Sequence, residues 1–174
     1  RSTFPVAGKT QVLLNDGKKQ MLFDWKTKKE IWHTDNNFNA SIQASKFNYT
    51  TRATAYVKDC QLHVVDAKGK DKQLTNDGSR NIVYGQSVHR DEFGINGGLY
   101  WSNDGKKLAF YRMDQSMVTD FPLVNIPELD WKPAEGESRI ATPAPEKYPM
   151  AGEKSHKVTV GVYDMNTGNV IYLD

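Results

Sequence analysis

The sequence is short of several features that mark common protein classes. It has one cysteine, Cys60, in 174 residues, so it cannot form a disulfide within the chain or build a cysteine-rich metal site. The formal net charge is only +2, with both signs interleaved, which argues against a nucleic-acid or anionic-membrane partner. No apolar run is long enough to span a bilayer. Hydrophobic residues make up 38% and charged residues 25%, the balance of a globular domain.

Catalytic and metal-binding motifs are also scarce, so no metal and no cofactor are expected. Three histidines are scattered without metal-ligand spacing: His33, His63 and His156. A Gly-x-Ser-x-Gly nucleophile elbow is absent, because residues 85–89 lack its second glycine. Ser87, His89 and Asp91 alternate along one segment, which does not give the nucleophile–base–orienter order of a catalytic triad. A self-contained hydrolase that uses Ser87 and His89 is therefore the weakest hypothesis.

What the sequence does contain is short strands joined by polar turns, with almost no helical periodicity. Residues 41–84 indicate four such strands, and the pattern restarts after Tyr100. Residues 101–112 align with residues 47–58, and residues 160–168 resemble residues 62–69. A repeated unit of four strands is typical of a β-propeller, whose blades each have roughly 40–50 residues.

We therefore predict an all-β fold, a partial β-propeller of four-stranded antiparallel blades over residues 1–174, with residues 1–9 as a lead-in. Trp25, Trp32 and Trp101 are expected to pack within the blades. Three to four blades make an open arc, so the chain is expected to belong to a larger ring or to close by pairing with a second copy. It begins with Arg1 and shows no signal peptide, which we interpret as a piece of a longer protein.

Two segments interrupt the strand pattern. Residues 86–98 form a polar insert in which four charged or titratable residues, 89–92, are followed by three glycines. About one helical turn is expected there, near residues 90–93. Residues 113–157 carry six prolines and lack strong alternation. Since proline cannot donate to a central ladder, this segment is expected to be an extended arm outside the blade.

The insert holds two adjacent acids, Asp91 and Glu92. A carboxylate pair on a short turn can bind a cation and accept charge-assisted hydrogen bonds from an ammonium group. The alternative is a solvated acidic turn paired with a neighbouring arginine or lysine, because clustered acids mark functional sites in only some proteins. The spacing alone leaves both interpretations open.

Five segments carry a family resemblance: residues 87–95, 101–102, 109–118, 148–152 and 158–163. In order and spacing they resemble the N-terminal propeller of prolyl-oligopeptidase-family serine exopeptidases, of the dipeptidyl peptidase IV and bacterial prolyl tripeptidyl aminopeptidase type. The likeness is dense from about Ile82 to Leu173 and thinner before it. The resemblance implies an eight-bladed ring over a C-terminal α/β-hydrolase domain that carries Ser-Asp-His. This chain lacks that domain, so we expect it to be inactive alone.

The resemblance also implies a role for the acidic pair. Glu92, and with it Asp91, would bind the free α-amine of a peptide from a short helix within the insert. The distance from that anchor to the nucleophile would set the length of the released product. Dipeptidyl members have two glutamates here, whereas this chain has Asp91-Glu92, a departure that favours tripeptide release and leaves dipeptide release open.

Further expectations follow from the same resemblance. The partners would be peptides with a free N-terminus, whose access the propeller gates, and a homodimer would form through the 113–157 arm. The location would be periplasmic or secreted. The alternative function is a non-enzymatic protein-binding β-propeller, which the repeats and the missing elbow favour. A Gly-x-Ser-x-Gly motif encoded downstream of Asp174 would remove this alternative.

Overall fold

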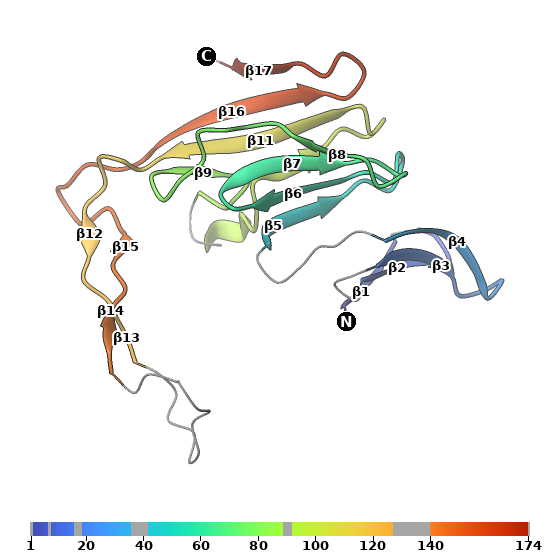
Figure 1. The fold of residues 1–174 in the computed structure, drawn as a ribbon, viewed down its shortest axis with the longest axis horizontal. Helices are drawn as coiled ribbons and strands as arrows, with labels where there is room; N and C mark the ends of the chain where they lie inside the picture. Colours follow the sequence, from blue (N-terminus) through green and yellow to red (C-terminus); the bar gives the residue numbers. More distant parts are fainter. Residues whose placement is uncertain are drawn as a thin grey trace. The chain divides into compact units, whose positions relative to one another are not determined.

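The computed structural model describes residues 2–6, 8–15, 19–35, 42–88, 92–126 and 140–173 (Figure 1). These residues form strands and connecting turns, with one 3₁₀ turn, η1 (Glu92–Gly94). The chain divides into two compact units. Unit 1 combines Arg1–Met113 with Val158–Asp174, and unit 2 is Asp114–Lys157. The all-β prediction is confirmed.

The described residues of unit 1 form three sheets, which we call blades 1, 2 and 3. Blade 1 has the order β1 (Ser2–Pro5), β2 (Gln11–Asn15), β3 (Gln20–Asp24) and β4 (Lys29–Thr34). Blade 2 has the order β5 (Ile42–Phe47), β6 (Thr54–Lys58), β7 (Gln61–Val65) and β8 (Asp71–Gln73). Blade 3 has the order β10 (Leu99–Trp101), β11 (Lys107–Asp114), β16 (Lys157–Asp164) and β17 (Val170–Leu173), with β9 (Ile82–Tyr84) also paired to β11 (Figure 1). This repetition of four strands per blade confirms the predicted partial propeller, with β9 as an additional fifth strand in blade 3.

The first strand was not expected, because residues 1–9 were predicted to be a lead-in. Instead β1 pairs antiparallel with β2, with Phe4 opposite Leu13. β1 is an edge strand that ends at Pro5, a position where the missing N–H of proline breaks no ladder bond. The prediction was wrong because four residues that include a proline carry little strand pattern of their own.

Two hydrophobic cores lie between the blades. The first contains Val6, Leu13 and Leu22 of blade 1 with Phe47 of blade 2. The second joins blades 2 and 3 and includes ten buried residues: Ala53, Ala55, Val57, Leu62, Val64, Tyr84, Leu99, Leu108, Phe110 and Tyr163. Each sheet therefore covers the face of the next one, as the blades of a propeller do.

Hydrogen bonds also join neighbouring blades. The Trp32 indole donates to the Ala67 carbonyl at 3.0 Å, and the Trp101 indole donates to the Lys46 carbonyl at 3.0 Å. These contacts confirm the expected packing of both tryptophans. Trp25 is an exception, because it lies in the turn after β3 and is 57% exposed.

Aspartates begin the hairpin between the third and fourth strands of every blade. Asp24 accepts hydrogen bonds from the backbone of Lys26 and Thr27, and Asp66 accepts them from residues 68 and 70. Asp164 accepts them from residues 166 and 167. The carboxylate satisfies turn N–H groups that no strand partner reaches, which is why aspartate suits this position.

These turns predict an acid-sensitive contribution to stability. Backbone hydrogen bonds from Thr27 and Thr167 lower the pKa values of Asp24 and Asp164. A carboxylate with a lowered folded pKa stabilises the fold above its ordinary pKa, and this contribution is lost as the pH falls through the lowered value. We expect the free energy of unfolding to decline below about pH 4, and to decline less steeply in the double variant Asp24→Asn, Asp164→Asn. Urea unfolding across pH measures this, and equal slopes would contradict it.

The two faces of blade 3 differ in what they contact. The ring centroids of Phe110 and Tyr172 lie 6.0 Å apart on the face that packs toward blade 2. Side chains alternate along a strand, so Ile171 and Leu173 point to the other face, where they are 59% and 51% exposed. Tyr111 shares that face, since it follows Phe110 in β11. An open apolar sheet face of this kind is suited to cover a further layer of structure.

Unit 2 is an extended ribbon with two short ladders (Figure 1). β12 (Asp120–Phe121) pairs with β15 (Glu146–Lys147), and β13 (Val124–Asn125) pairs with β14 (Thr142–Pro143). Several of its apolar side chains are exposed, among them Ile126 at 72% and Ile140 at 75%. This unit occupies the region for which the sequence predicted a proline-rich arm.

Candidate functional site

The polar insert leaves blade 3 between β9 and β10 and returns to it at nearly the same place. We call this place, where Gly85 and Gly98 meet beside Tyr111, the neck of the insert. The Gly85 N–H donates to the Tyr111 carbonyl at 2.9 Å, and the Tyr111 N–H donates to the Gly98 carbonyl at 3.0 Å. Both ends of the insert are thus bonded to one residue of β11. A third bond inside the loop runs from the Ser87 hydroxyl to the Ile95 carbonyl at 2.6 Å.

Glycine is required where the two ends of the insert meet. A Cβ added at Gly98 would lie 2.4 Å from the Gln86 carbonyl oxygen and 2.8 Å from the Gly85 carbonyl carbon. Gly85 has a φ of +65°, and a Cβ there would lie 2.8 Å from the Leu99 side chain. The two backbone segments are therefore in direct contact, and the neck has no room for side chains.

The insert carries η1, which begins at Glu92. Within it Phe93 has φ 56° and ψ 23°, the left-handed conformation that L-residues with large side chains rarely adopt. Its side chain is 86% exposed, more than any other large apolar side chain among the described residues. Strained residues of this kind concentrate at functional sites, since folding stability alone would not select them.

The structure describes some of the predicted site residues and not others. Glu92 lies at the start of η1, within the short turn expected near this position. Asp91 lies outside the described residues, as do His89 and Arg90. Ser87 donates its hydroxyl to a backbone carbonyl, an arrangement that fixes the loop and does not activate a nucleophile.

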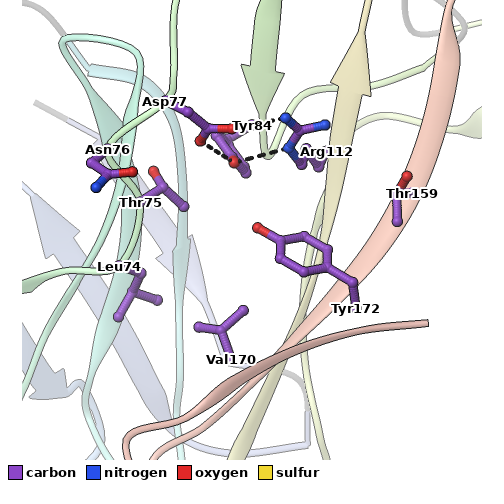
Figure 2. Close-up of a pocket in the computed structure, with 9 residues that line it drawn as sticks. All are labelled: Leu74, Thr75, Asn76, Asp77, Tyr84, Arg112, Thr159, Val170 and Tyr172. Atoms are coloured by element: carbon purple, nitrogen blue, oxygen red, sulfur yellow. Dashed lines mark hydrogen bonds and ion pairs between the residues drawn. The ribbon is translucent and has the colours of Figure 1, made fainter. Parts of the chain in front are cut away.

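A second polar group lies beside the neck and was missed in the sequence. The Tyr84 hydroxyl donates to Asp77 Oδ1 at 2.5 Å and accepts from Arg112 Nε at 3.1 Å. Arg112 Nη2 donates to Asp77 Oδ2 at 2.8 Å, which closes a three-membered network (Figure 2). Tyr84 is 1% exposed, so its hydroxyl needs these partners.

The pKa values of this network follow from its burial and bonding. Burial, and then the bond to Asp77, raise the pKa of the Tyr84 phenol well above its ordinary value. Burial would raise the pKa of Asp77, but the bonds from Tyr84 and Arg112 lower it overall. The bond to Asp77 raises the pKa of Arg112. At neutral pH the network therefore holds a carboxylate, a guanidinium and an un-ionised phenol.

The network forms one end of a cavity of about 500 Å³. Leu74 and Val170 lie at the opposite end, and the Tyr172 ring lies between them and Arg112 (Figure 2). The cavity therefore has a polar end, where opposite charges are paired, and an apolar end. Its walls are the segment that follows β8 of blade 2 and the strands β9, β11, β16 and β17 of blade 3.

A sequence signal for the network does exist. Leu108, Phe110 and Arg112 follow at every second position of β11, so all three share one face of the strand. Leu108 and Phe110 are 0% and 1% exposed. A charge that continues a buried face needs a partner, because an isolated buried charge is costly. The pattern predicts a partnered arginine, although it does not identify Asp77 or Tyr84.

Neither a metal centre nor a membrane-spanning helix is found in the part of the chain that the structure describes. No three side chains of His, Cys, Asp or Glu come together there as ligands. None of the helical segments described is long and apolar enough to cross a bilayer.

Comparison with known proteins identifies the fold and the family. A family model described as the dipeptidyl peptidase IV (DPP IV) N-terminal region matches residues 14–174. The probable dipeptidyl-aminopeptidase B of Talaromyces marneffei is 32% identical over 137 residues, which are 74% of this chain and 15% of that protein. The protein of the same name from Uncinocarpus reesii is 29% identical over 138 residues, 76% of this chain and 15% of that protein.

Solved structures agree. A structure from Bacteroides ovatus ATCC 8483, named for an inferred dipeptidyl aminopeptidase IV, is 36% identical with a TM-score of 0.74, and the match covers 98% of this chain and 22% of that one. Porphyromonas gingivalis dipeptidyl peptidase 4 has a TM-score of 0.67 at 20% identity, over 99% of this chain and 23% of that one, which shows the shared fold. The chain thus spans less than a quarter of each of these relatives. It belongs to the family of dipeptidyl peptidase IV N-terminal regions.

Proposed function

We propose that this chain anchors the free N-terminus of a peptide substrate and limits access to a hydrolase active site. The anchor is the carboxylate of Glu92, with Asp91 beside it, and the bound group is the substrate's α-ammonium. A carboxylate and an ammonium form a charge-assisted hydrogen bond, which is stronger than a neutral one. The catalytic residues belong to a C-terminal α/β-hydrolase domain of the serine type, outside this chain.

One observation carries this proposal. The acidic turn is held on a loop whose two ends are both bonded to Tyr111, so Glu92 starts from a fixed base in blade 3. A fixed anchor sets one distance to the nucleophile, and only a product of one length then fits between them. The release of a tripeptide or a dipeptide depends on that distance, and the Asp91-Glu92 pair favours the tripeptide.

The remaining parts of the proposal concern assembly and location. Exposed apolar side chains on unit 2, such as Phe121 at 41% and Ile140 at 75%, suit a contact with a second copy of the protein. The open face of blade 3 suits the next blade of a larger ring. By likeness to the family we also propose that the whole protein is exported, to the periplasm or outside the cell.

The proposal predicts a defined loss for Glu92→Gln in the full-length protein. We expect kcat/KM for peptides with a free N-terminus to fall by about 10- to 100-fold, because a hydrogen bond between charged groups contributes about 1.5–3 kcal/mol. N-acetylated peptides, which cannot make this ion pair, should be turned over at the same low rate by both proteins. Steady-state kinetics on matched free and acetylated peptides measures both effects.

The matched control is Asp59→Asn, which removes one exposed carboxylate from the hairpin between β6 and β7. This substitution should leave kcat/KM unchanged for both the free-amine and the acetylated peptides. If Glu92→Gln behaves like this control, Glu92 is not the amine anchor. A full-length protein without hydrolase activity would favour the protein-binding alternative.

A further inference from the structure

The neck of the insert and the Asp77–Tyr84–Arg112 network are adjacent in the chain at two points. Tyr84 directly precedes Gly85, which forms one side of the neck. Arg112 directly follows Tyr111, to which both sides of the neck are bonded. The Tyr84–Arg112 hydrogen bond, at 3.1 Å, therefore joins the two residues that flank the Gly85–Tyr111 bond.

Asp77 adds a third point of attachment. It lies in the segment after β8, at the end of blade 2, and binds both Tyr84 at 2.5 Å and Arg112 at 2.8 Å. Apart from it, the neck is hydrogen-bonded to β11 and packs against apolar side chains such as Val57 of blade 2. With it, the residues that flank the neck are also tied to the preceding blade through charge-assisted bonds.

The composition of the network suits a positioning role better than a stabilising one. An ion pair at this site gives modest net stability, since the side chains of Asp77 and Arg112 remain 47% and 26% exposed. A hydrophobic residue at position 112 would continue the buried face of β11 instead. What the polar network adds is one defined arrangement of Tyr84, because hydrogen bonds have direction and apolar contacts do not.

We propose that Tyr84 is a positioning residue for peptide binding: its hydroxyl, held by Asp77 and Arg112, fixes the neck of the insert and with it the location of Glu92. The inference rests on the proposed amine-binding function. A small displacement of a binding group weakens binding strongly when the substrate is held at a second point. Here the second point is the hydrolase site.

The test is Tyr84→Phe in the full-length protein, which keeps the ring and removes only the hydroxyl. We expect KM for free-amine peptides to rise about 3- to 10-fold with kcat changed less than about twofold, because an anchor used equally in the ground and transition states affects binding alone. Acetylated peptides should keep their kcat/KM. A purely structural defect would lower the active fraction and reduce turnover of both substrates equally.

Tyr56→Phe is the matched control. Tyr56 is another buried tyrosine, 9% exposed on β6, whose hydroxyl bonds to Asp71 and whose ring stacks on His63. Its loss should leave the ratio of free-amine to acetylated turnover unchanged. If Tyr84→Phe does not fold, Asp77→Asn provides a milder change at a more exposed residue, with a smaller fall of the same ratio expected.

The outcomes separate the two proposals. If Glu92→Gln lowers the ratio while Tyr84→Phe and Asp77→Asn do not, the positioning role is wrong and amine binding stands. If Glu92→Gln leaves the ratio unchanged, both are wrong. Amide hydrogen exchange gives a further readout, since Gly85 and Tyr111 should exchange faster in Tyr84→Phe than in Tyr56→Phe.

Discussion

Replacing Gly98 by alanine is expected to open the neck of the insert. The added Cβ would lie within 3.0 Å of three backbone atoms, the oxygen and nitrogen of Gln86 and the carbonyl carbon of Gly85. Backbone atoms cannot rotate away as a flexible side chain can, so the two ends of the loop must separate. The hydrogen bond from Tyr111 to the Gly98 carbonyl would then lengthen or break.

Two measurements should report this change. Urea unfolding should show a loss of about 1–3 kcal/mol, the usual cost of forcing an extra carbon into a packed site. In the full-length protein, kcat/KM for free-amine peptides should fall by about 100-fold, because the whole insert moves with the neck. The effect should exceed that of Tyr84→Phe, which leaves the backbone bonds in place.

Gly97→Ala is the matched control for this experiment. Gly97 is the adjacent residue, and a Cβ added there would meet no atom within 4 Å. Its free energy of unfolding should change by less than about 0.5 kcal/mol, and turnover should stay the same. If the two alanine variants behave alike, the ends of the insert are not in contact and the neck does not control the loop.

The second large effect is expected in the core between blades 2 and 3. Phe110 is 1% exposed, and its ring lies 2.3 Å from where a Cβ at Gly161 would be. Phe110→Ala should lower the free energy of unfolding by about 3–5 kcal/mol, because it leaves a cavity in the core. Gly161→Ala should cost about 1–3 kcal/mol for the opposite reason, because it overfills the same place.

The double variant tests whether these two costs share one cause. Removing the Phe110 ring should make room for the new Cβ at position 161. The double variant Phe110→Ala, Gly161→Ala should therefore lose about 0.5–3 kcal/mol less free energy of unfolding than the two single variants lose together. Leu13→Ala, in the core between blades 1 and 2, provides the control pair. Combined with Gly161→Ala, it should be additive within about 0.5 kcal/mol, as distant sites are. Additivity in both pairs would contradict the ring contact.

The sequence predicted the blades because their information is local. Alternating strands and aspartate- or glycine-containing turns recur at similar spacing, and the same local rules then produce the same sheet in each blade. Trp25 shows where local rules fail. It follows a strand pattern, but the Asp24 carboxylate binds the backbone of residues 26 and 27 and begins the turn there, which leaves Trp25 57% exposed.

The candidate site was less predictable because its contacts join distant segments. Glu92 could be identified from a motif that is contiguous in the chain, and its role remains a proposal. The network of Asp77, Tyr84 and Arg112 brings together three segments up to 35 residues apart. Only the inward-facing position of Arg112 is visible in the sequence, while its partners depend on how blade 2 packs against blade 3.

The pairing of β11 with β16 has a consequence for how this protein can vary. These two strands are direct neighbours in the sheet, yet residues 115–156 separate them in the chain. Blade 3 would close equally well around a much shorter connection, since closure entropy grows only with the logarithm of loop length. The connection can therefore be lengthened, trimmed or exchanged during evolution while the propeller keeps its architecture. New assembly surfaces can be acquired at this one point without redesigning the sheet.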